Sequence, residues 1–288
     1  MPEARIIGSI EVDEIPDGIF HATLNRFPDL EHFILMAMAK LGFGDVKDVF
    51  RDPDIAHVIP RWLAKHGTHP VSVFLFESGG EFSDSNLQEL APDILSQTQQ
   101  SFPLLVTHDL AGTVWTNRST ESVDSKIAAG AVSHGIRIVR SHDLARFASA
   151  SVANGWNDSE VATELLTPGW SRMDPPNTQI VGVVRRYFPK PKVISINLND
   201  TGKVSLGDTL WVRLRNALTP FQVQSMQQSN SAVTLAQTGC IGVEVELTPS
   251  QVVSDGDVFL DMNVDVAPSA GRQTSALRDL LGEFTGGY

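Results

Sequence analysis

A cation, a hydroxyl, an imidazole and a carboxylate follow one another at Arg140, Ser141, His142 and Asp143. They come directly after residues 136–139, a strand-like run whose Ile136, Ile138 and Val139 are apolar. An arginine fork and an imidazole at a strand end offer charge-assisted hydrogen bonds to phosphate oxygens. The pattern therefore predicts that Arg140 and His142 bind an anion. The alternative is a solvated ion pair between Arg140 and Asp143 without any ligand.

The elements that would position these residues alternate between strand and helix over residues 1–166. Buried strands are predicted for the runs RIIGSIEV, HFILMAMA, VSVFLF, PLLVTH and IRIVRS. Helices are predicted between them, for DPDIAHVIPRWLAKHG (52–67), NLQELAPDILSQTQQ and SVDSKIAAGAVSHG. This alternation predicts an α/β unit with a mostly parallel sheet.

The pattern of apolar residues changes across residues 167–178. Proline, glycine and polar residues interrupt any hydrophobic period there and predict a linker. From 179 to 266, a series of strand-like runs is separated by Gly-Asp, Asn-Asp and Thr-Gly turns. That pattern predicts a small antiparallel β-barrel or sandwich. Residues 267–288 form a tail whose apolar spacing predicts one short amphipathic helix. The predicted fold class is thus α/β followed by all-β.

Composition narrows the function classes. The chain has 288 residues and a formal net charge of −12, which argues against attraction of its whole surface to nucleic acid or anionic membrane. The only cysteine, Cys240, excludes an intramolecular disulfide, a cysteine-based zinc site and a cysteine-held iron–sulfur cluster within one chain. His57, His66 and His69 surround one predicted helix end in poor geometry for zinc, so no metal or cofactor is expected. No signal peptide or apolar membrane span is recognised, so a cytoplasmic protein is expected.

Several motifs of the first unit match one known family. ESGGEF at 77–82 resembles a strand ending in Asp-Pro-Gly-x-Gly-Phe, and HFILMAMAK is similar to a strand with a Leu-Met-His-Met run. The segment SKIAAGAVSHGIRIVRSHDL resembles a final helix and an eighth strand that ends in Ile-Val-Arg-x-His-Asp. Together these motifs resemble the second half of the dihydropteroate synthase barrel, over about residues 5–150. The resemblance implies a partial (β/α) barrel of the TIM type.

The resemblance also implies a ligand, because this folate-related family binds a pterin methyl diphosphate. Arg140 and His142 match the residues that hold the departing diphosphate, and Glu77 stands where an acid bonds the pterin. Met38 falls in the strand that lines the substrate in that family. The family lysine is absent near His108 and Asp109, and Gly8 and Ser9 replace the Asn-Asp pair.

A half-barrel raises the question of what completes it, because about five strands cannot close an eight-stranded barrel. The resemblance implies a second chain that carries the missing half, a homo-oligomer of half-barrels, or a degenerate remnant. Activity as a dihydropteroate synthase-like transferase is expected only if another chain completes the barrel.

Residues 178–266 have a resemblance of their own. The LGDTL and DGDVF turns, the QVQSMQ strand and the Tyr-Phe-x-Lys sequence resemble the translation-factor β-barrel, the second domain of elongation factors of the Tu type. The likeness extends to the small barrels that end collagenase-like peptidases. Positive residues gather in its first strands, with aromatic residues interleaved: Arg185, Arg186, Lys190, Lys192, Lys203, Arg213 and Arg215, with Tyr187, Phe188 and Trp211.

Two hypotheses follow. The first is a pterin- or phosphorylated-ligand-binding protein that uses Glu77, Arg140, His142 and Met38, without catalytic residues of its own. The second is a non-catalytic adaptor whose β-barrel binds RNA or protein through the surface of residues 185–192. The alternative for that surface is that its aromatic residues are core and its charges form an ordinary solvated face.

Overall fold

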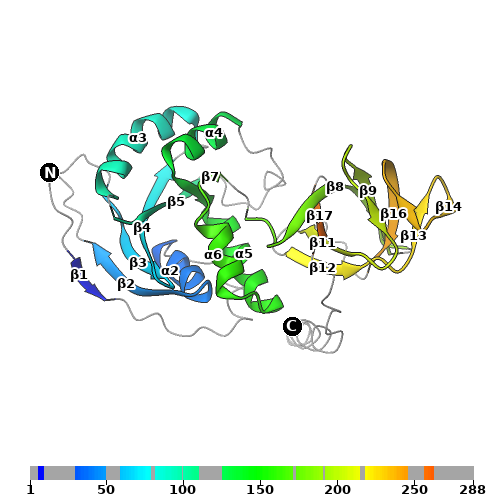
Figure 1. Cartoon of the computed structure of the whole chain (residues 1–288), viewed down its shortest axis with the longest axis horizontal. Coiled ribbons are helices and arrows are strands. Elements are labelled where there is room, and N and C mark those ends of the chain that lie inside the picture. The colour runs from blue at the N-terminus through cyan, green and yellow to red at the C-terminus, as the bar shows by residue number, and fades with distance from the viewer. Residues whose placement is uncertain are drawn as a thin grey trace, which may run out of the picture.

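The fold is described from a computed structural model, for residues 6–9, 30–49, 59–78, 82–98, 100–109, 125–170, 173–190, 192–214, 218–245 and 256–262. The chain forms two units that lie side by side (Figure 1). The first unit contains β1 (Ile6–Ser9), α2 (Leu30–Lys40), β2 (Phe43–Val49), β3 (Trp62–His66), β4 (His69–Ser78), α3 (Asp84–Gln97), β5 (Phe102–Asp109), α4 (Ser125–His134), β6 (Arg137–Arg140), α5 (Ser141–Asn154), α6 (Asp158–Leu165) and β7 (Gly169–Trp170).

The first unit is built on one seven-stranded sheet whose strands lie in sequence order, from β1 to β7. β1 to β4 pair with their neighbours in antiparallel fashion, whereas β4, β5, β6 and β7 pair in parallel. Antiparallel neighbours need only short turns, and the parallel strands are joined through helices. The sheet is therefore mixed, with a parallel half that carries the strand ends of interest.

Helices cover both faces of this sheet. α2, α5 and α6 contribute to a core that includes Val73, Val106 and Val139 on one face. α3 and α4 pack against the other face, where Phe74, Leu105 and Ile138 are buried. Because alternate strand residues point to opposite faces, each parallel strand is apolar on both sides.

The predicted barrel is wrong for the described part of the chain, which forms an open sheet with both faces already covered by helices. The physical reason for expecting a completing chain is therefore removed. The prediction of a mostly parallel sheet holds only from β4 onward.

Two element predictions in this unit are corrected. The run HFILMAMA is part of helix α2, in which all residues from Phe33 to Met38 are buried. Burial on every side hides the helical period, and the Leu, Met and Ala content favours a helix. Trp62–His66, at the end of the predicted helix 52–67, forms strand β3 instead. Its side chains alternate in burial, and a two-residue turn begun by Gly67 (φ 58°) joins it to β4. Residues 52–58 lie outside the described part.

The predicted helices NLQELAPDILSQTQQ and SVDSKIAAGAVSHG are confirmed by α3 and α4. α3 begins at a capping box, in which Ser83 and Asn86 bond each other's backbone N–H groups. α6 begins the same way, with Asn157 as the cap and Glu160 as its partner. These local contacts satisfy N–H groups that would otherwise lack partners at the helix start.

The second unit is all-β, as predicted. Its larger sheet has eight antiparallel strands in the order β12-β11-β17-β8-β9-β16-β13-β14, and β10 pairs with β15 in a second, two-stranded sheet. The ends of the larger sheet are not paired with each other among the described residues, so no closed barrel is observed there. The strands of the whole second unit are β8 (Thr178–Phe188), β9 (Val193–Leu198), β10 (Val204–Ser205), β11 (Thr209–Arg213), β12 (Leu218–Gln222), β13 (Met226–Gln228), β14 (Ser231–Ala232), β15 (Leu235–Ala236), β16 (Gly239–Glu244) and β17 (Asp257–Asp261).

The two units meet where α5 faces β11, β12 and β17. Ala150, Trp211, Leu218 and Phe259 form a buried cluster there. Trp156 packs between the units, with its ring centroid 5.1 Å from Phe147 and 5.5 Å from Trp211. The junction is therefore a packed interface rather than a loose tether.

Gly182 lies in β8, which pairs with β9 on one side and β17 on the other. A Cβ at this position would overlap the backbone carbonyl oxygen of Asn197. We expect Gly182→Ala to lower the free energy of unfolding by about 2 kcal/mol, measured by urea unfolding. Gly44→Ala is the control, since a Cβ at Gly44 meets nothing within 4 Å. Equal effects of the two variants would contradict this packing argument.

Candidate functional site

The parallel strands end at one edge of the first sheet, where polar side chains gather. In the strand register Glu77 of β4 lies beside His108 of β5, and Thr107 lies beside Arg140 of β6. Helix α5 begins at the next residue, Ser141. We call Glu77, His108, Arg140, Ser141 and His142 the strand-end site.

The sheet divides this site into two sides. Val106 packs with the α5 core, so strand alternation places His108 on the α5 side, and Glu77 lies beside it. Arg140 lies on the opposite side, where its Cζ atom is 5.3 Å from the centroid of the Trp170 ring. A guanidinium over an indole face is a favourable cation–π contact that fixes the side chain. Arg140 is thereby held at the edge of the sheet.

The chain leaves neighbouring strands toward opposite faces at this point. β5 is followed by α4 on one face, and β6 is followed by α5 on the other. In open α/β sheets such a divergence leaves a crevice beyond the carboxyl ends of the strands, where ligands bind. The strand-end site lies at this divergence.

The N-terminus of α5 lies at the same divergence. Arg140 is its N-cap residue, with an extended backbone (φ −75°, ψ 143°), and its side chain makes no capping hydrogen bond. The first-turn N–H groups of a helix lack helical partners, and the helix dipole places partial positive charge there. Such an end favours an anionic group.

Ser141 and His108 form a pair that resembles the start of a nucleophilic site. The His108 Nδ1 atom lies 2.9 Å from the Ser141 Oγ atom, a hydrogen-bond distance. Acyl transfer uses such a pair, but its serine must reach the substrate. Ser141 is only 3% exposed. The pair therefore fixes the β5 and β6 ends to each other and does not present a nucleophile.

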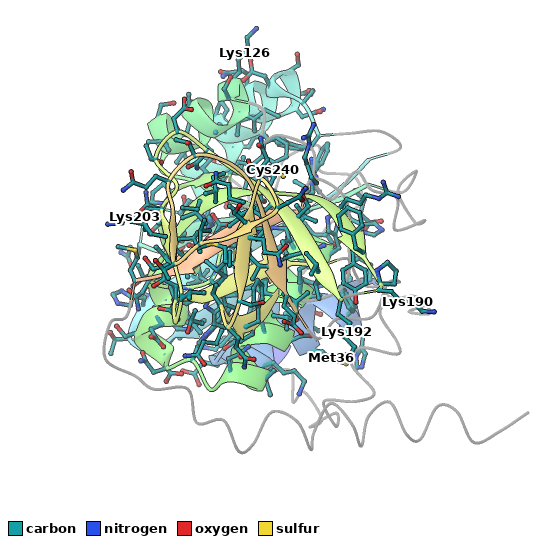
Figure 2. The ribbon with its side chains drawn as sticks, turned by 90° about the vertical axis from the view of Figure 1, so that its right-hand side faces the viewer. Met36, Lys126, Lys190, Lys192, Lys203 and Cys240 are labelled. Carbon is teal, nitrogen blue, oxygen red and sulfur yellow. The ribbon has the colours of Figure 1, made fainter. Side chains whose placement is uncertain are left out.

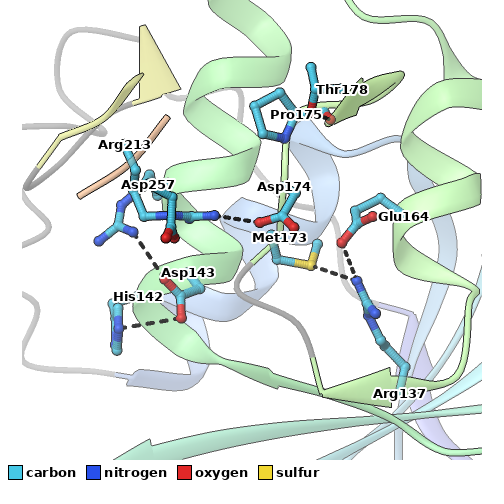
Figure 3. A network of polar contacts seen from close by, with 11 residues as sticks. Arg137, His142, Asp143, Glu164, Met173, Asp174, Pro175, Thr178, Arg213 and Asp257 are labelled. Carbon is cyan, nitrogen blue, oxygen red and sulfur yellow. Dashed lines mark hydrogen bonds and ion pairs between the residues drawn. The ribbon is translucent and has the colours of Figure 1, made fainter. Parts of the chain in front are cut away.

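His142 lies beside a buried charge pair (Figure 3). Its Nε2 atom is 3.5 Å from the Asp143 Oδ2 atom, and Arg146 donates to Asp143 Oδ1 at 3.1 Å. Burial lowers the pKa of His142 to about 4, although the Asp143 carboxylate acts in the other direction. About a third of the side chain is exposed, yet its Nε2 atom is buried. His142 is thus a neutral hydrogen-bonding group at pH 7, not a cation.

Asp143 stays ionised in this setting. Burial pushes its pKa up, but the adjacent His142 ring and, after it, the guanidinium groups of Arg146 and Arg213 hold the pKa below its ordinary value. The alternative predicted from the sequence was a solvated ion pair between Arg140 and Asp143. The Asp143 carboxylate is instead 1% exposed and bonded to Arg146.

The structure brings some of the predicted residues together and separates others. Arg140, His142 and Glu77 lie at the strand ends, and Glu77 is exposed. Met38 lies in α2, fully buried in the hydrophobic core, and does not reach this edge. The sequence resemblance had placed it on a strand.

The basic residues of the second unit fall into a buried group and an exposed group. Arg213 is buried in ion pairs with Asp174 and Asp257, and Trp211 is core. Arg215 lies outside the described residues. The remaining cations of residues 185–192 stay exposed around the β8–β9 turn: Arg185, Arg186, Lys190 and Lys192.

Sequence reasoning missed Trp170 and the buried role of Arg213. Trp170 sits in a segment that predicted a linker, and only the pairing of β7 with β6 brings it to Arg140. Arg213 follows an apolar strand run, and neither of its ion-pair partners is near it in sequence. Its partners come from far along the chain, so spacing carried no signal for them.

No protein family and no curated protein matches the sequence. Solved structures similar to it include the C-terminal domain of a Geobacillus thermoleovorans protein described as a U32 peptidase, at 10% identity and a TM-score of 0.25, covering 28% of this chain and 96% of that one. A bacterial selenocysteine-specific elongation factor, EF-Sec, matches at 14% identity and a TM-score of 0.26. That match covers 62% of this chain and 36% of the factor.

A second elongation factor, SelB from Methanococcus maripaludis, matches at 12% identity and a TM-score of 0.24, over 79% of this chain and 52% of that one. Scores this low establish neither a shared fold nor a shared function. Neither the comparisons nor the open sheet supports the predicted dihydropteroate synthase barrel or a pterin ligand. Among the described residues, no helix is long and apolar enough to cross a membrane.

The neutral state of His142 predicts a pH dependence. A pKa that is lower in the folded chain than in the unfolded chain gives stability that is present above the unfolded value of 6.5 and is lost as pH falls through about 4. We expect the His142 ring resonances to titrate near 4 by NMR, and His142→Gln to lose less stability than the parent over this range. The control His32→Gln, at an exposed histidine, should lose as much stability as the parent when the pH falls. A His142 titration near 6.5 would refute the assignment.

Proposed function

We propose that the first unit binds a small molecule through its phosphate group at the strand-end site. The observation that carries this proposal is the divergence of β5 and β6 toward opposite faces, with the uncapped start of α5 at the same point. Arg140 supplies the permanent cation, and its stacking on Trp170 limits the side-chain freedom lost on binding.

The charges at this edge support an anion of modest size. The α5 start offers backbone N–H groups, and Arg140 offers a fork that suits two phosphate oxygens. Asp143 would repel an anion in the first turn of α5, but its carboxylate is turned into the buried pair with Arg146. His142 contributes a hydrogen bond without charge, and the exposed Glu77 is available to the uncharged part of the ligand.

We propose that this site binds its ligand without chemical turnover. The family lysine expected near His108 is absent, and Ser141 is buried. Nothing in this geometry selects a pterin over another phosphorylated compound. The phosphate group is therefore the only part of the ligand that we propose, and the rest of the ligand must be identified by experiment.

Inorganic diphosphate is a suitable probe. We expect Arg140→Ala to weaken its binding at least about tenfold in isothermal titration calorimetry, because a charge-assisted bond is lost. Trp170 fluorescence should also change on binding, since Arg140 lies over its ring.

Lys126→Ala is the matched control, because it removes one exposed cation from α4 without touching the strand ends. Equal affinity of the parent and the Arg140→Ala protein, both folded by circular dichroism, would rule out the proposed site.

A second candidate function is RNA binding by the β8–β9 turn. Arg186 lies over Phe188 with 5.1 Å between its Cζ atom and the ring centroid, and Phe188 is 39% exposed. Figure 2 places Lys190 and Lys192 on one side of the second unit, away from Lys203. An exposed aromatic among cations offers stacking and phosphate contacts to a single strand.

For this candidate, the Arg185→Glu, Arg186→Glu double variant should weaken binding of a uridine oligonucleotide by about tenfold or more and flatten its salt dependence. The measurement is fluorescence anisotropy at several salt concentrations. Lys126→Glu with Lys203→Glu reverses as many charges elsewhere and should have little effect. An equal loss in both double variants would point to net charge alone.

A further inference from the structure

A pocket of about 700 Å³ lies at the edge of the first sheet where the parallel strands begin. The starts of β4 and β5 form one part of its lining, and helix α6 with the two residues after it forms another. Small-molecule sites in proteins usually measure roughly 300–1,000 Å³. The pocket therefore has the size of a ligand site.

This pocket is distinct from the strand-end site. His69 lines it at the first residue of β4, whereas Glu77 of the strand-end site lies near the other end of the same strand. An extended strand rises about 3.3 Å per residue, so the two positions are more than about 20 Å apart. A ligand in the pocket would thus bind independently of a phosphate at the strand ends.

Part of the lining is apolar. Phe102 lies at the start of β5, on the same face as the buried Leu104 and Val106, and is itself only partly buried. Pro70 of β4 and Leu166, the C-cap of α6, also line the pocket. A partly exposed aromatic ring offers a flat apolar surface to the C–H groups of a ligand.

Helix α6 adds a row of hydroxyl groups to the lining. Ser159, Thr163 and Thr167 follow one another at intervals of four residues, so they lie along one side of the helix. Thr163 Oγ1 donates to the carbonyl oxygen of Ser159 at 2.9 Å, and Thr167 Oγ1 donates to that of Thr163 at 2.5 Å. A hydroxyl has one donor and two lone pairs, so these threonines present acceptors to a ligand.

The other polar groups of the described lining are uncharged amide and hydroxyl groups and one imidazole. Gln100 is exposed, and its side-chain amide offers both donors and an acceptor. Ser101 shares a hydrogen bond of 2.6 Å with Ser72, and His69 presents an imidazole. A lining of this kind suits an uncharged ligand that is rich in hydrogen-bond donors and has an apolar face.

We propose that this pocket binds a neutral carbohydrate. A pyranose ring carries hydroxyl groups around its edge and C–H groups on its faces. Its hydroxyls can rotate to donate to Thr163 and Thr167, while one ring face packs against Phe102. A nucleobase fits this lining less well, because its edge alternates donors and acceptors in fixed positions. The proposal depends neither on the phosphate site nor on RNA binding by the second unit.

Saturation-transfer difference NMR on the full chain can test this proposal with the neutral disaccharides maltose, cellobiose and lactose. We expect saturable binding of at least one of them at millimolar concentration, with the strongest signals on ring C–H protons. Inorganic diphosphate should not displace it, because the two sites are far apart. Binding of none of the three, displacement by diphosphate, or tighter binding of adenosine than of any disaccharide would overturn the proposal.

Two substitutions locate the binding. Thr163→Val removes an exposed hydroxyl and keeps the branched shape, and Phe102→Leu removes the ring and keeps an apolar side chain. Each should raise the Kd of the bound disaccharide about fivefold. Ser133→Ala is the control, because it removes an exposed hydroxyl that bonds a carbonyl of its own helix, α4, outside the pocket. Unchanged affinity in either pocket variant, folded by circular dichroism, or an equal loss in Ser133→Ala would contradict the proposed site.

Discussion

The burial of the Arg213 guanidinium is the constraint on which the arrangement of this molecule depends. A charge that is 1% exposed must be compensated by carboxylates, and here these come from β17 and from the connection between the units. Arg213 also lies over the ring of Phe259. Arg213 thus joins the sheet of the second unit to the connection between the units.

Helix α5 carries this constraint to the candidate site. Its first turn holds His142 at the strand ends and Asp143 in the buried charge pair, its middle packs on α2, and Ala150 contacts the second unit. The strand-end site and the junction between the units therefore lie on the same helix.

The sequence predicted most strands of the second unit and helices α3 and α4, because their periods and turn residues are local signals. It failed at HFILMAMA, where burial on all sides removes the helical period, and at Trp62–His66, where a two-residue turn decides the structure. Arg140 and His142 could be proposed from their place after a strand. Asp174, Trp170 and Arg213 could not, because their partners are set by packing between distant segments.

The proposed binding of an anion at the start of α5 can be followed through backbone amide chemical shifts during a titration with inorganic diphosphate. If an anion binds there, we expect saturable shifts centred on Ser141, His142 and Asp143, together with the Trp170 indole N–H. Shifts confined to the β8–β9 turn, or none at any residue at millimolar diphosphate, would contradict it.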